Sequence, residues 1–252
     1  MKDISVSKIR IVSFNVFYAL RKKRLQHALS ETLARMKPDV VCLQEVWAGK
    51  KSDFARELAR LLNYHLLFSR RAAFAGRRIG IASLMREPSR RGSSVILPRS
   101  HRSRPRVLQL VTLQTNHISW RIANTHLSVI SFRARKAQLA AILEALDALE
   151  RQDCAMPTIL VGDFNTRTKK EVDAFARMLT ENGFQIPQML PHSWNVLGIR
   201  RQLDWIAARH CSIVAMGAIP HIKGSDHKPV WADIVWHAAE RKTNPRRIET
   251  AQ

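Results

Sequence analysis

Polar side chains that can bind a metal or move a proton stand where several apolar runs of this sequence end. Each cluster joins a carboxylate, an amide or an imidazole to a short hydrophobic stretch. Ligand sites of open α/β sheets are built where strands end, so we expect these side chains to converge on one site. The clusters are Asn15 in SFNV, Glu45 in LQEVW, Asn124 to His126 in NTHLS, Asp163 and Asn165 in GDFN, Asp204 in QLDWI, and Asp226 with His227 in SDHKPV.

The oxygen-bearing members of this set favour a hard divalent cation. Mg²⁺ is usually held by one or two carboxylates together with water and substrate phosphate oxygens. Glu45, Asp163 and Asp226 supply carboxylates, while Asn15 and Asn165 supply neutral oxygens that orient a ligand or a water without adding charge. The set therefore predicts a Mg²⁺ site that would also accept Mn²⁺.

The two histidines of the set add proton chemistry. His126 and His227 can donate hydrogen bonds to a phosphate or move protons near neutral pH. A zinc site is less favoured, because the sequence has no HExxH and no cysteine among the clusters. Carboxylates, imidazoles and a hard metal together point to attack of water on phosphorus.

The segments that must position these residues alternate between strand-like and helix-like patterns. Short β-branched and apolar runs predict strands, and apolar residues at helical spacing predict helices. A capping box formed by Thr168 and Glu171 marks one helix start, Gly183 closes that helix, and Ser52 is the expected cap of another. The predicted strands are 8–16, 40–43, 79–85, 107–113, 121–126, 158–162, 203–207, 213–219 and 230–236, and the clearest helices are 25–36 and 133–149.

Two segments differ from this alternation. Residues 86–106 contain seven arginines, one glutamate and three prolines, which predicts a basic loop or loose hairpin. Residues 238–252 carry further arginine and lysine around Pro245 and are predicted to form a basic C-terminal tail. We therefore expect one catalytic domain over 1–237 and a tail over 238–252.

Composition limits the class of protein. The chain has 252 residues, of which 46% are hydrophobic, and a formal charge of +22, so it is long and apolar enough to fold around its own core. Three cysteines, Cys42, Cys154 and Cys211, are too few for a disulfide framework. No run of apolar residues is long enough to span a membrane or to serve as a secretory signal, which predicts a soluble, cytoplasmic protein.

The ordered set of motifs FN, LQEV, NTHL, GDFN, LDWI and SDHKPV resembles the endonuclease/exonuclease/phosphatase superfamily of metal-dependent phosphoesterases. The resemblance extends from about Ile9 to Val235, nearly the whole chain. It implies a four-layer α/β/β/α sandwich of the deoxyribonuclease I type, in which two mixed β-sheets are flanked by helices and the site lies at one rim.

The resemblance also implies a role for each residue on the metal side. Glu45 matches the principal metal ligand, with Asn15 beside it, and Asp226 matches a further carboxylate of the metal site or a partner of the neighbouring histidine. Asp163 matches the group that orients or deprotonates the attacking water, and Asn165 the residue that holds water or phosphate.

The phosphate side is assigned in the same way. His126 resembles the histidine that contacts phosphate, and His227 the residue that stabilises the pentacoordinate phosphorus or acts as the base. Asp204 would pair with His227 and fix its tautomer. The choice of base between Asp163 and His227 stays open.

The substrate is less constrained, because one fold serves many chemistries. The charge of +22 favours a nuclease acting on DNA or RNA. We also expect the protein to be a monomer. The alternative is a lipid or inositol phosphoesterase held on an anionic lipid surface. The LQEV form of the second motif and the FNVFYAL segment are compatible with this alternative. A non-catalytic binding module is the least favoured of the three hypotheses. Trp194 and Trp47 are predicted to contact the substrate.

Overall fold

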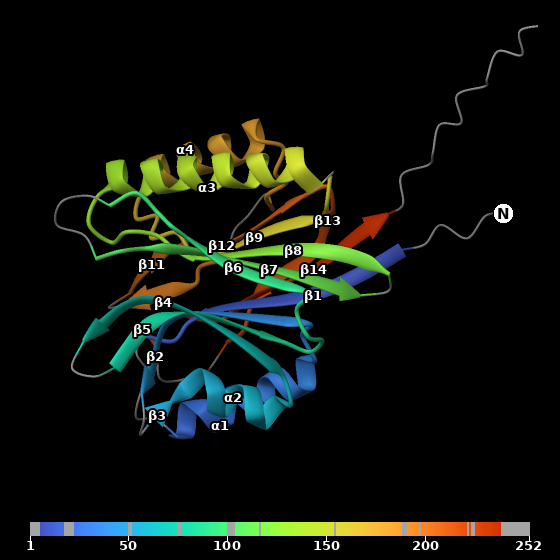
Figure 1. Cartoon of the computed structure of the whole chain (residues 1–252). Coiled ribbons are helices and arrows are strands. Elements are labelled where there is room, and N and C mark those ends of the chain that lie inside the picture. The colour runs from blue at the N-terminus through green and yellow to red at the C-terminus, as the bar shows by residue number, and fades with distance from the viewer. Residues whose placement is uncertain are drawn as a thin grey trace, which may run out of the picture.

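Two β-sheets pack face to face, and helices cover their outer faces (Figure 1). This arrangement confirms the predicted four-layer α/β/β/α sandwich. The computed structural model describes residues 6–17, 23–49, 52–74, 77–99, 104–115, 117–153, 155–187, 191–196, 198–220, 222 and 225–237. The predicted tail at 238–252 and Cys154 lie outside these residues.

The first sheet has the strand order β13-β14-β1-β2-β5-β4, with β3 paired to β2. Only β1 and β2 are parallel among its neighbouring strands. Helices α1 and α2 cover its outer face. The elements are β1 (Val6–Asn15), α1 (Lys23–Met36), β2 (Val40–Gly49), β3 (Ser52–Asp53), α2 (Phe54–Leu62), β4 (His65–Phe74), β5 (Arg77–Met85), β13 (Ser212–Ala218) and β14 (Val230–His237).

The second sheet has the order β12-β9-β8-β7-β6, in which only β8 and β9 are parallel. Helices α3 and α4 pack on its outer face. A separate two-stranded hairpin, β10–β11, precedes β12. The elements are β6 (Arg91–Ile96), β7 (Val107–Thr115), β8 (Ile118–His126), α3 (Phe132–Asp153), β9 (Thr158–Asp163), α4 (Lys169–Glu181), β10 (Trp194–Val196), β11 (Ile199–Arg201) and β12 (Asp204–Arg209).

Three layers of apolar side chains hold the sandwich together. One fills the space between the sheets and includes Ile11, Val111 and Trp120, all at most 1% exposed. The other two lie under the helix pairs on either side. Because the central strands are buried on both faces, they need apolar residues at nearly every position, which is why runs such as Val40–Leu43 and Thr158–Gly162 show no alternation.

The topology brings the predicted site residues to one rim. The parallel pairs β1–β2 and β8–β9 deliver their C-terminal ends to the same edge of the sandwich. Strand β12 runs antiparallel to β9, so its first residue, Asp204, stands opposite Asp163. Strand ends far apart in the sequence therefore meet.

The structure corrects three details of the predicted elements. Strand β4 lies in a stretch for which no strand was predicted. Within residues 86–106, six residues form the exposed edge strand β6, paired with β7, rather than a loop throughout. The cap of α2 is Asp53, not Ser52, because the Asp53 side chain accepts the backbone N–H of Arg56 at 3.1 Å.

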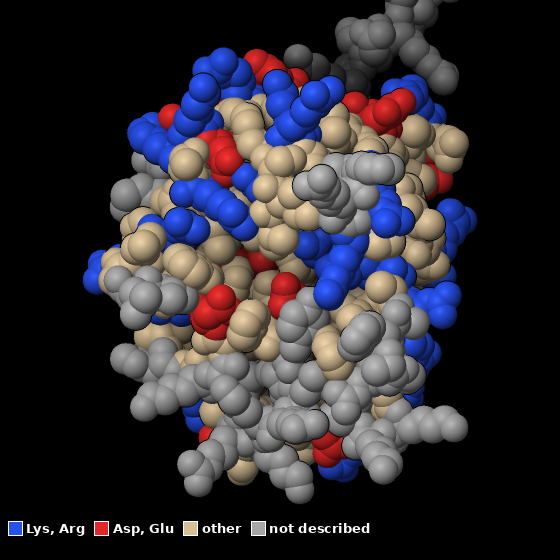
Figure 2. All heavy atoms as spheres, turned by 90° about the vertical axis from the view of Figure 1, so that its left-hand side faces the viewer, with Lys and Arg blue, Asp and Glu red and all other residues tan. Residues whose placement is uncertain are grey.

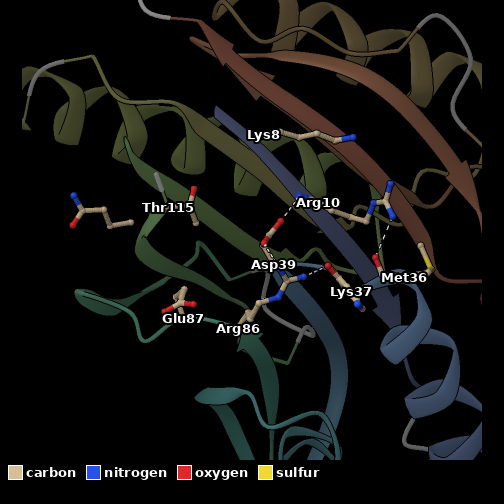
Figure 3. A pocket seen from close by; sticks show the side chains of 9 residues that line it. Lys8, Arg10, Met36, Lys37, Asp39, Arg86, Glu87 and Thr115 are labelled. Carbon is tan, nitrogen blue, oxygen red and sulfur yellow. Dashed lines mark hydrogen bonds and ion pairs between the residues drawn. The ribbon is translucent and has the colours of Figure 1, made fainter. Parts of the chain in front are cut away.

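A pocket lies at the rim opposite the predicted site (Figure 3). It is lined by residues near the start of β1, such as Arg10, and by Asp39 and Arg86. Three of its charged side chains are engaged locally: Arg86 pairs with Asp39 at 3.1 Å and donates to the backbone oxygen of Lys37, while Arg10 donates to that of Met36 at 3.1 Å. This internal pairing is typical of a structural joint between elements.

Candidate active site

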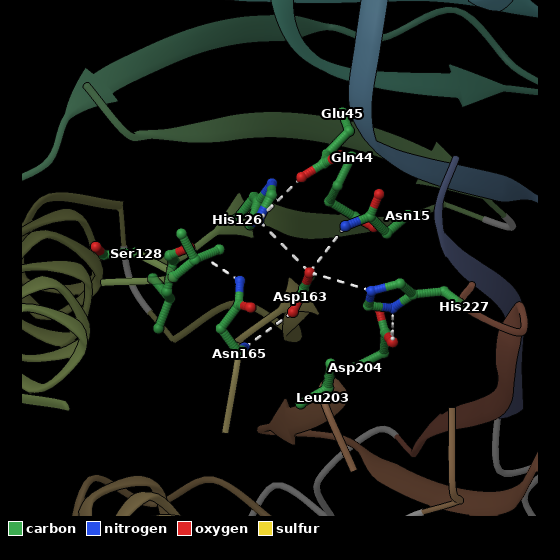
Figure 4. Close-up of polar contacts among 12 residues, drawn as sticks. Asn15, Gln44, Glu45, His126, Ser128, Asp163, Asn165, Leu203, Asp204 and His227 are labelled. Atoms are coloured by element: carbon green, nitrogen blue, oxygen red, sulfur yellow. Dashed lines mark hydrogen bonds and ion pairs between the residues drawn. The ribbon is translucent and has the colours of Figure 1, made fainter. Parts of the chain in front are cut away.

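Asp163, the last residue of β9, lies at the centre of the polar cluster (Figure 4). Its Oδ2 accepts a hydrogen bond from Asn15 Nδ2 at 2.8 Å, and its Oδ1 accepts the backbone N–H of Asn165 at 2.8 Å. Burial of the carboxyl group raises the pKa of Asp163, and the nearby Asp204 carboxylate raises it further, against the opposing charge of His227. Asp163 is thus held in place and poised to accept a proton.

His227 and Asp204 form a buried pair beside Asp163. His227 Nδ1 lies 2.7 Å from Asp204 Oδ2, and His227 Nε2 lies 3.8 Å from Asp163 Oδ2. Burial alone would lower the pKa of His227, but the two carboxylates outweigh it and raise the pKa to about 10. The ring is therefore a cation whose Nε2 faces the centre of the site.

Two serines that the sequence analysis did not select fix this pair. Ser193 Oγ accepts the backbone N–H of Asp204 at 3.1 Å. Ser225 Oγ accepts the backbone N–H of His227 at 3.0 Å and donates to the backbone oxygen of Asn15 at 2.7 Å. Ser225 stands in the SDHKPV motif, which was the available signal for it, whereas nothing in the sequence marks Ser193.

His126 approaches Asp163 from β8. Its Nε2 is 3.5 Å from Asp163 Oδ2 and 3.8 Å from Glu45 Oε1, and it makes no hydrogen bond within the described part of the chain. Burial lowers the pKa of His126 well below its ordinary value, and the charges of Arg106 and Arg71 lower it further. The site therefore combines a neutral imidazole with a cationic one.

Glu45 reaches the cluster through a bulge in β2. The pairing of β2 with β5 shifts between Leu43 and Val46, and Glu45 has a φ of 54°, a left-handed conformation that is strained for a residue other than glycine. Burial raises the pKa of Glu45, while Arg106 and Arg71 oppose that rise. Its Oε2 is buried and has no hydrogen-bond partner among the described residues.

The carboxylate oxygens that lack hydrogen-bond partners could bind a divalent cation at Glu45. Asp226 offers Oδ1, which is also buried without a hydrogen-bond partner among the described residues, while its Oδ2 accepts from Trp194 Nε1 at 2.7 Å. A second grouping, Asp163, Asp204 and His227, is compact enough to hold a metal, and Asp204 Oδ1 is likewise buried without a hydrogen-bond partner among the described residues. The other two members are already engaged, Asp163 by Asn15 and the backbone of Asn165, and His227 by Asp204. Glu45 and Asp226 are therefore the better pair of ligands, because each has a buried oxygen that is costly to leave unsatisfied.

The other predicted residues have identifiable partners. Asn15 also accepts the backbone N–H of Phe17 at 2.9 Å, so both ends of its amide are engaged and a contact with metal stays a prediction. Asn165 has a φ of 54°, and its Nδ2 donates to the backbone oxygen of Leu127 at 3.2 Å. Trp194 is tied to Asp226 and lies under the guanidinium of Arg201, 5.0 Å from the ring centroid.

The remaining aromatic residue, Trp47, is a half-buried residue of β2 opposite Ile79. Its predicted contact with substrate stays a prediction, as does that of Trp194.

The surface around the cluster is hollowed (Figure 2). On the face at the left of Figure 1, acidic side chains lie in and beside a central hollow, and Lys and Arg side chains lie above it and at its sides. An acidic floor suits a divalent cation, and a basic rim suits an anionic substrate. The arrangement can thus place a phosphate between a metal and two imidazoles, with a carboxylate at hand to orient water.

Comparisons with solved structures show the same fold. An endonuclease/exonuclease/phosphatase from Beutenbergia cavernae superposes with a TM-score of 0.73 at 20% identity, covering 90% of this chain and 71% of that one. D. rerio TDP2 complexed with single-strand DNA product superposes with a TM-score of 0.71 at 19% identity over 90% and 99% of the chains. The human Nocturnin catalytic domain with bound sulfate gives 0.71 at 19% over 94% and 97%.

The sequence comparisons assign the family. No curated protein matches the chain. The model of the Endonuclease/Exonuclease/phosphatase family matches residues 12–227, which is most of the sequence and spans every residue of the cluster. The predicted resemblance is thereby confirmed, and the chain belongs to the endonuclease/exonuclease/phosphatase family, whose members are hydrolytic phosphoesterases.

Proposed function

We propose that the protein is a Mg²⁺-dependent phosphodiesterase that cleaves nucleic acid by in-line attack of an activated water. The observation that supports this most directly is the placement of the Asp163 carboxylate between a neutral His126, at 3.5 Å, and a cationic His227, at 3.8 Å. Such a trio can take a proton from water on one side while donors face a phosphate on the other.

In this proposal Glu45 and Asp226 hold the metal. When bound, Mg²⁺ supplies positive charge to the phosphate and to the leaving oxygen. Mn²⁺ would serve as a substitute. Asn15 orients Asp163 through the hydrogen bond at 2.8 Å.

Asp163 is the base in this proposal. A carboxyl group whose pKa is raised by burial accepts a proton more readily than an ordinary aspartate, whereas a His227 with a pKa near 10 already carries its proton. His227 instead donates to the negative charge that develops on phosphorus, with Asp204 holding its ring. His126 and Asn165 contact the phosphate oxygens.

The charge distribution favours nucleic acid over a small phosphate ester. Basic side chains lie above the hollow and at its sides, and the whole chain carries +22. A polyanion gains from many such contacts at once, while a single phosphate gains from few. The solved neighbour that holds a single-strand DNA product is consistent with this substrate class. We further propose a cytoplasmic monomer; the described residues contain no helix long and apolar enough to cross a membrane.

A panel of substrates with Mg²⁺ or Mn²⁺ tests the proposal. Supercoiled plasmid, single-stranded DNA and RNA should be cleaved, EDTA should abolish cleavage, and D163N should lower the rate by about 100-fold or more. D173N, which removes an exposed carboxylate of α4, is the matched control and should leave the rate unchanged. An active D163N enzyme, or a wild-type protein inert on every substrate with either metal, would refute the proposal.

A second candidate is a lipid or inositol phosphoesterase. It is favoured by exposed apolar side chains on segments that follow site residues: Phe17 is 54% exposed, two residues after Asn15, and Ile130 is 50% exposed, four after His126. Apolar side chains beside a basic rim suit an anionic membrane surface. Turnover of sphingomyelin or phosphoinositides that depends on liposomes, without cleavage of any nucleic acid, would select this candidate.

A further inference from the structure

Two arginines stand on one side of the cluster and have no role in the mechanism above. Arg71 is a half-buried residue of β4, and Arg106, which is 5% exposed, directly precedes β7. Their strands belong to different sheets. A buried or half-buried guanidinium beside a metal site needs an explanation, because positive charge there opposes a cation.

The strand directions bring both residues to the site rim. Strands β2 and β4 both run antiparallel to β5, so β4 ends at the same rim as β2, where Glu45 lies. Strand β7 runs antiparallel to β8, so it begins where β8 ends at His126. Arg71 is near the end of β4 and Arg106 is at the start of β7, so each lies at the level of the site.

A hydrogen bond between the sheets holds the two strands together just below the arginines. Gln109 of β7 donates through Nε2 to Ser69 Oγ of β4 at 3.0 Å and to the backbone oxygen of Leu67 at 3.1 Å. Ser69 therefore faces β7. Both arginines lie closer to the rim than this hydrogen bond: Arg71 is two residues beyond Ser69 on β4, and Arg106 is three residues before Gln109, just ahead of β7.

Strands β2 and β4 each contain a bulge near the rim of the site, where each pairs with β5. The pairing of β4 with β5 shifts between Arg70 and Ala72, which makes Arg71 the additional residue of a bulge. Gly80 of β5 lies between this bulge and the one that carries Glu45, since it pairs with Arg70 on one side and Val46 on the other. Bulges re-aim side chains, and here one bulge carries a carboxylate and the other a guanidinium.

The electrostatic environment agrees with this placement. Arg106 and Arg71 are the two cations that most lower the pKa of Glu45, and they also lower that of His126. Both arginines thus lie close enough to act on Glu45 and His126. Two guanidiniums at the rim of a phosphate site are suited to a second phosphate, which they can bind with paired hydrogen bonds.

We propose that Arg71 and Arg106 form a subsite for a second phosphate group of the substrate, next to the phosphate that is cleaved. The proposal rests on the proposed phosphodiesterase function and adds a specificity: substrates with a neighbouring phosphate are preferred over isolated esters. The subsite binds this group and takes no part in bond cleavage, so it acts chiefly on KM.

The kinetic test uses two esters that differ by one phosphate. Thymidine 5′-(p-nitrophenyl phosphate) has only the scissile group, and its 3′-phosphorylated counterpart has a second one. R71M should lower kcat/KM for the 3′-phosphorylated ester by about 10- to 100-fold, mainly through KM, and for the simple ester by less than about threefold. R71K should lie between, because lysine keeps the charge but loses the planar pair of donors.

R70M is the matched control. Arg70 is the exposed neighbour of Arg71 on the same strand, so R70M removes the same charge and leaves the proposed subsite intact. It should behave as wild type on both esters. Equal losses for R71M on both esters, or no loss on either, would refute the subsite while leaving the phosphodiesterase proposal standing.

A binding measurement separates the two proposals further. In calorimetric titrations, wild type should bind thymidine 3′,5′-bisphosphate about 10-fold more tightly than thymidine 5′-phosphate, and R71M should lose this preference. If wild type hydrolyses neither ester, the cleavage of plasmid, single-stranded DNA and RNA decides the proposed function, and the calorimetric preference decides the subsite. Glycerophosphoinositol and its ring-bisphosphorylated form, titrated in the same way, show whether the second phosphate belongs to a nucleotide or to an inositol.

Discussion

The Asp204–His227 pair shows how one residue acts through another. Asp204 is fully buried, and its Oδ2 lies 2.7 Å from His227 Nδ1, so the imidazole is held with Nε2 directed at Asp163, 3.8 Å away. A carboxylate placed in this way both orients the ring and retains its proton. Loss of Asp204 should therefore change the orientation and the protonation of His227 and leave the other residues of the site unchanged.

We predict that D204N lowers kcat by about 10- to 100-fold, because the ring loses its orienting charge. The double variant D204N/H227A should be no slower than H227A alone, since both changes remove one function. This double-mutant cycle is measured by steady-state rates of the three variants and the wild type on plasmid or on a nucleotide ester. Circular dichroism confirms that each variant is folded. Multiplicative losses in the double variant would show that Asp204 acts independently of His227.

Glu45 gives a prediction that does not depend on turnover. Its Oε2 is buried without a hydrogen-bond partner among the described residues, so the carboxylate costs stability until a cation binds. E45Q should raise the metal-free melting temperature by about 2–4 °C, equivalent to about 1 kcal/mol, and abolish the rise that Mn²⁺ causes in wild type. Differential scanning fluorimetry with and without Mn²⁺ measures both effects. A full Mn²⁺-induced shift in E45Q would remove Glu45 from the metal site.

Residue types and motif order predicted most of the cluster, because the motifs lie at the ends of buried strands, within one or next to one, and buried strands are easy to recognise. Glu45, His126, Asp163, Asp204 and His227 lie together as expected. The sequence did not identify the residues whose role depends on contacts between distant strands. Nothing local to Arg71 distinguishes it from Arg70, and only the strand register separates them.

At the scale of elements, the spacing between β8 and β9 sets the distance between His126 and Asp163. Gly162 has a φ of 144°, and a Cβ at this position would lie 1.9 Å from the backbone oxygen of Thr125. The neighbouring atom is backbone and cannot move aside cheaply. The glycine is therefore required for the two strands to approach and for their last residues to meet.

G162A should accordingly destabilise the fold by about 3 kcal/mol or more, since overpacking adds to an unfavourable backbone conformation. G198A is the comparison: Gly198 also has a positive φ, of 81°, but nothing lies within 4 Å of a Cβ there, so the cost should be about 1 kcal/mol. Urea denaturation measures both. Similar values for the two variants would contradict the argument from close approach.

The elements that the sequence missed have a physical reason in common. Strand β4 mixes arginine, alanine and aromatic residues without regular alternation because its bulge breaks the period. Strand β6 is exposed at every residue, so no apolar pattern marks it. By contrast, α3 and β9 are packed against a core and were predicted, because burial imposes the pattern that sequence analysis can read.

The rim opposite the site supplies a prediction about pH. Asp233 of β14 accepts from Arg10 of β1 at 2.6 and 2.8 Å and from Lys8 at 2.8 Å, and chiefly the Arg10 hydrogen bonds lower its pKa to about 2. An unfolded aspartate has a pKa of about 3.9. The stabilisation is therefore fully present above about pH 4 and lost as the pH falls through about 2.

D233N should lower the free energy of unfolding by about 1–2 kcal/mol at neutral pH, and the difference from wild type should shrink towards zero between about pH 4 and pH 2. Urea denaturation at a series of pH values measures the difference. D173N serves as the control for an exposed carboxylate. A difference that persists unchanged at about pH 2 would show that the ion pair is not its source.

At the scale of the whole molecule, the uneven placement of charge matters more than its total. The chain carries +22, yet acidic groups gather in and beside the hollow of the site, with cations above it and at its sides (Figure 2). Under the proposed function this pattern would separate two tasks, since the acidic floor suits a divalent cation and the basic rim suits a polyanion.

Binding of a polynucleotide should therefore depend steeply on salt. Each phosphate of a single strand that is neutralised contributes a slope of about −0.7 to log K against log salt, so about four contacts weaken binding roughly 50-fold between about 50 and 200 mM salt. Fluorescence anisotropy with a labelled single strand and the D163N protein measures binding without cleavage. R70M should reduce the slope by at most about one contact. An affinity that stays constant over this range would mean that the basic rim does not bind nucleic acid, and the liposome assays would then decide the substrate.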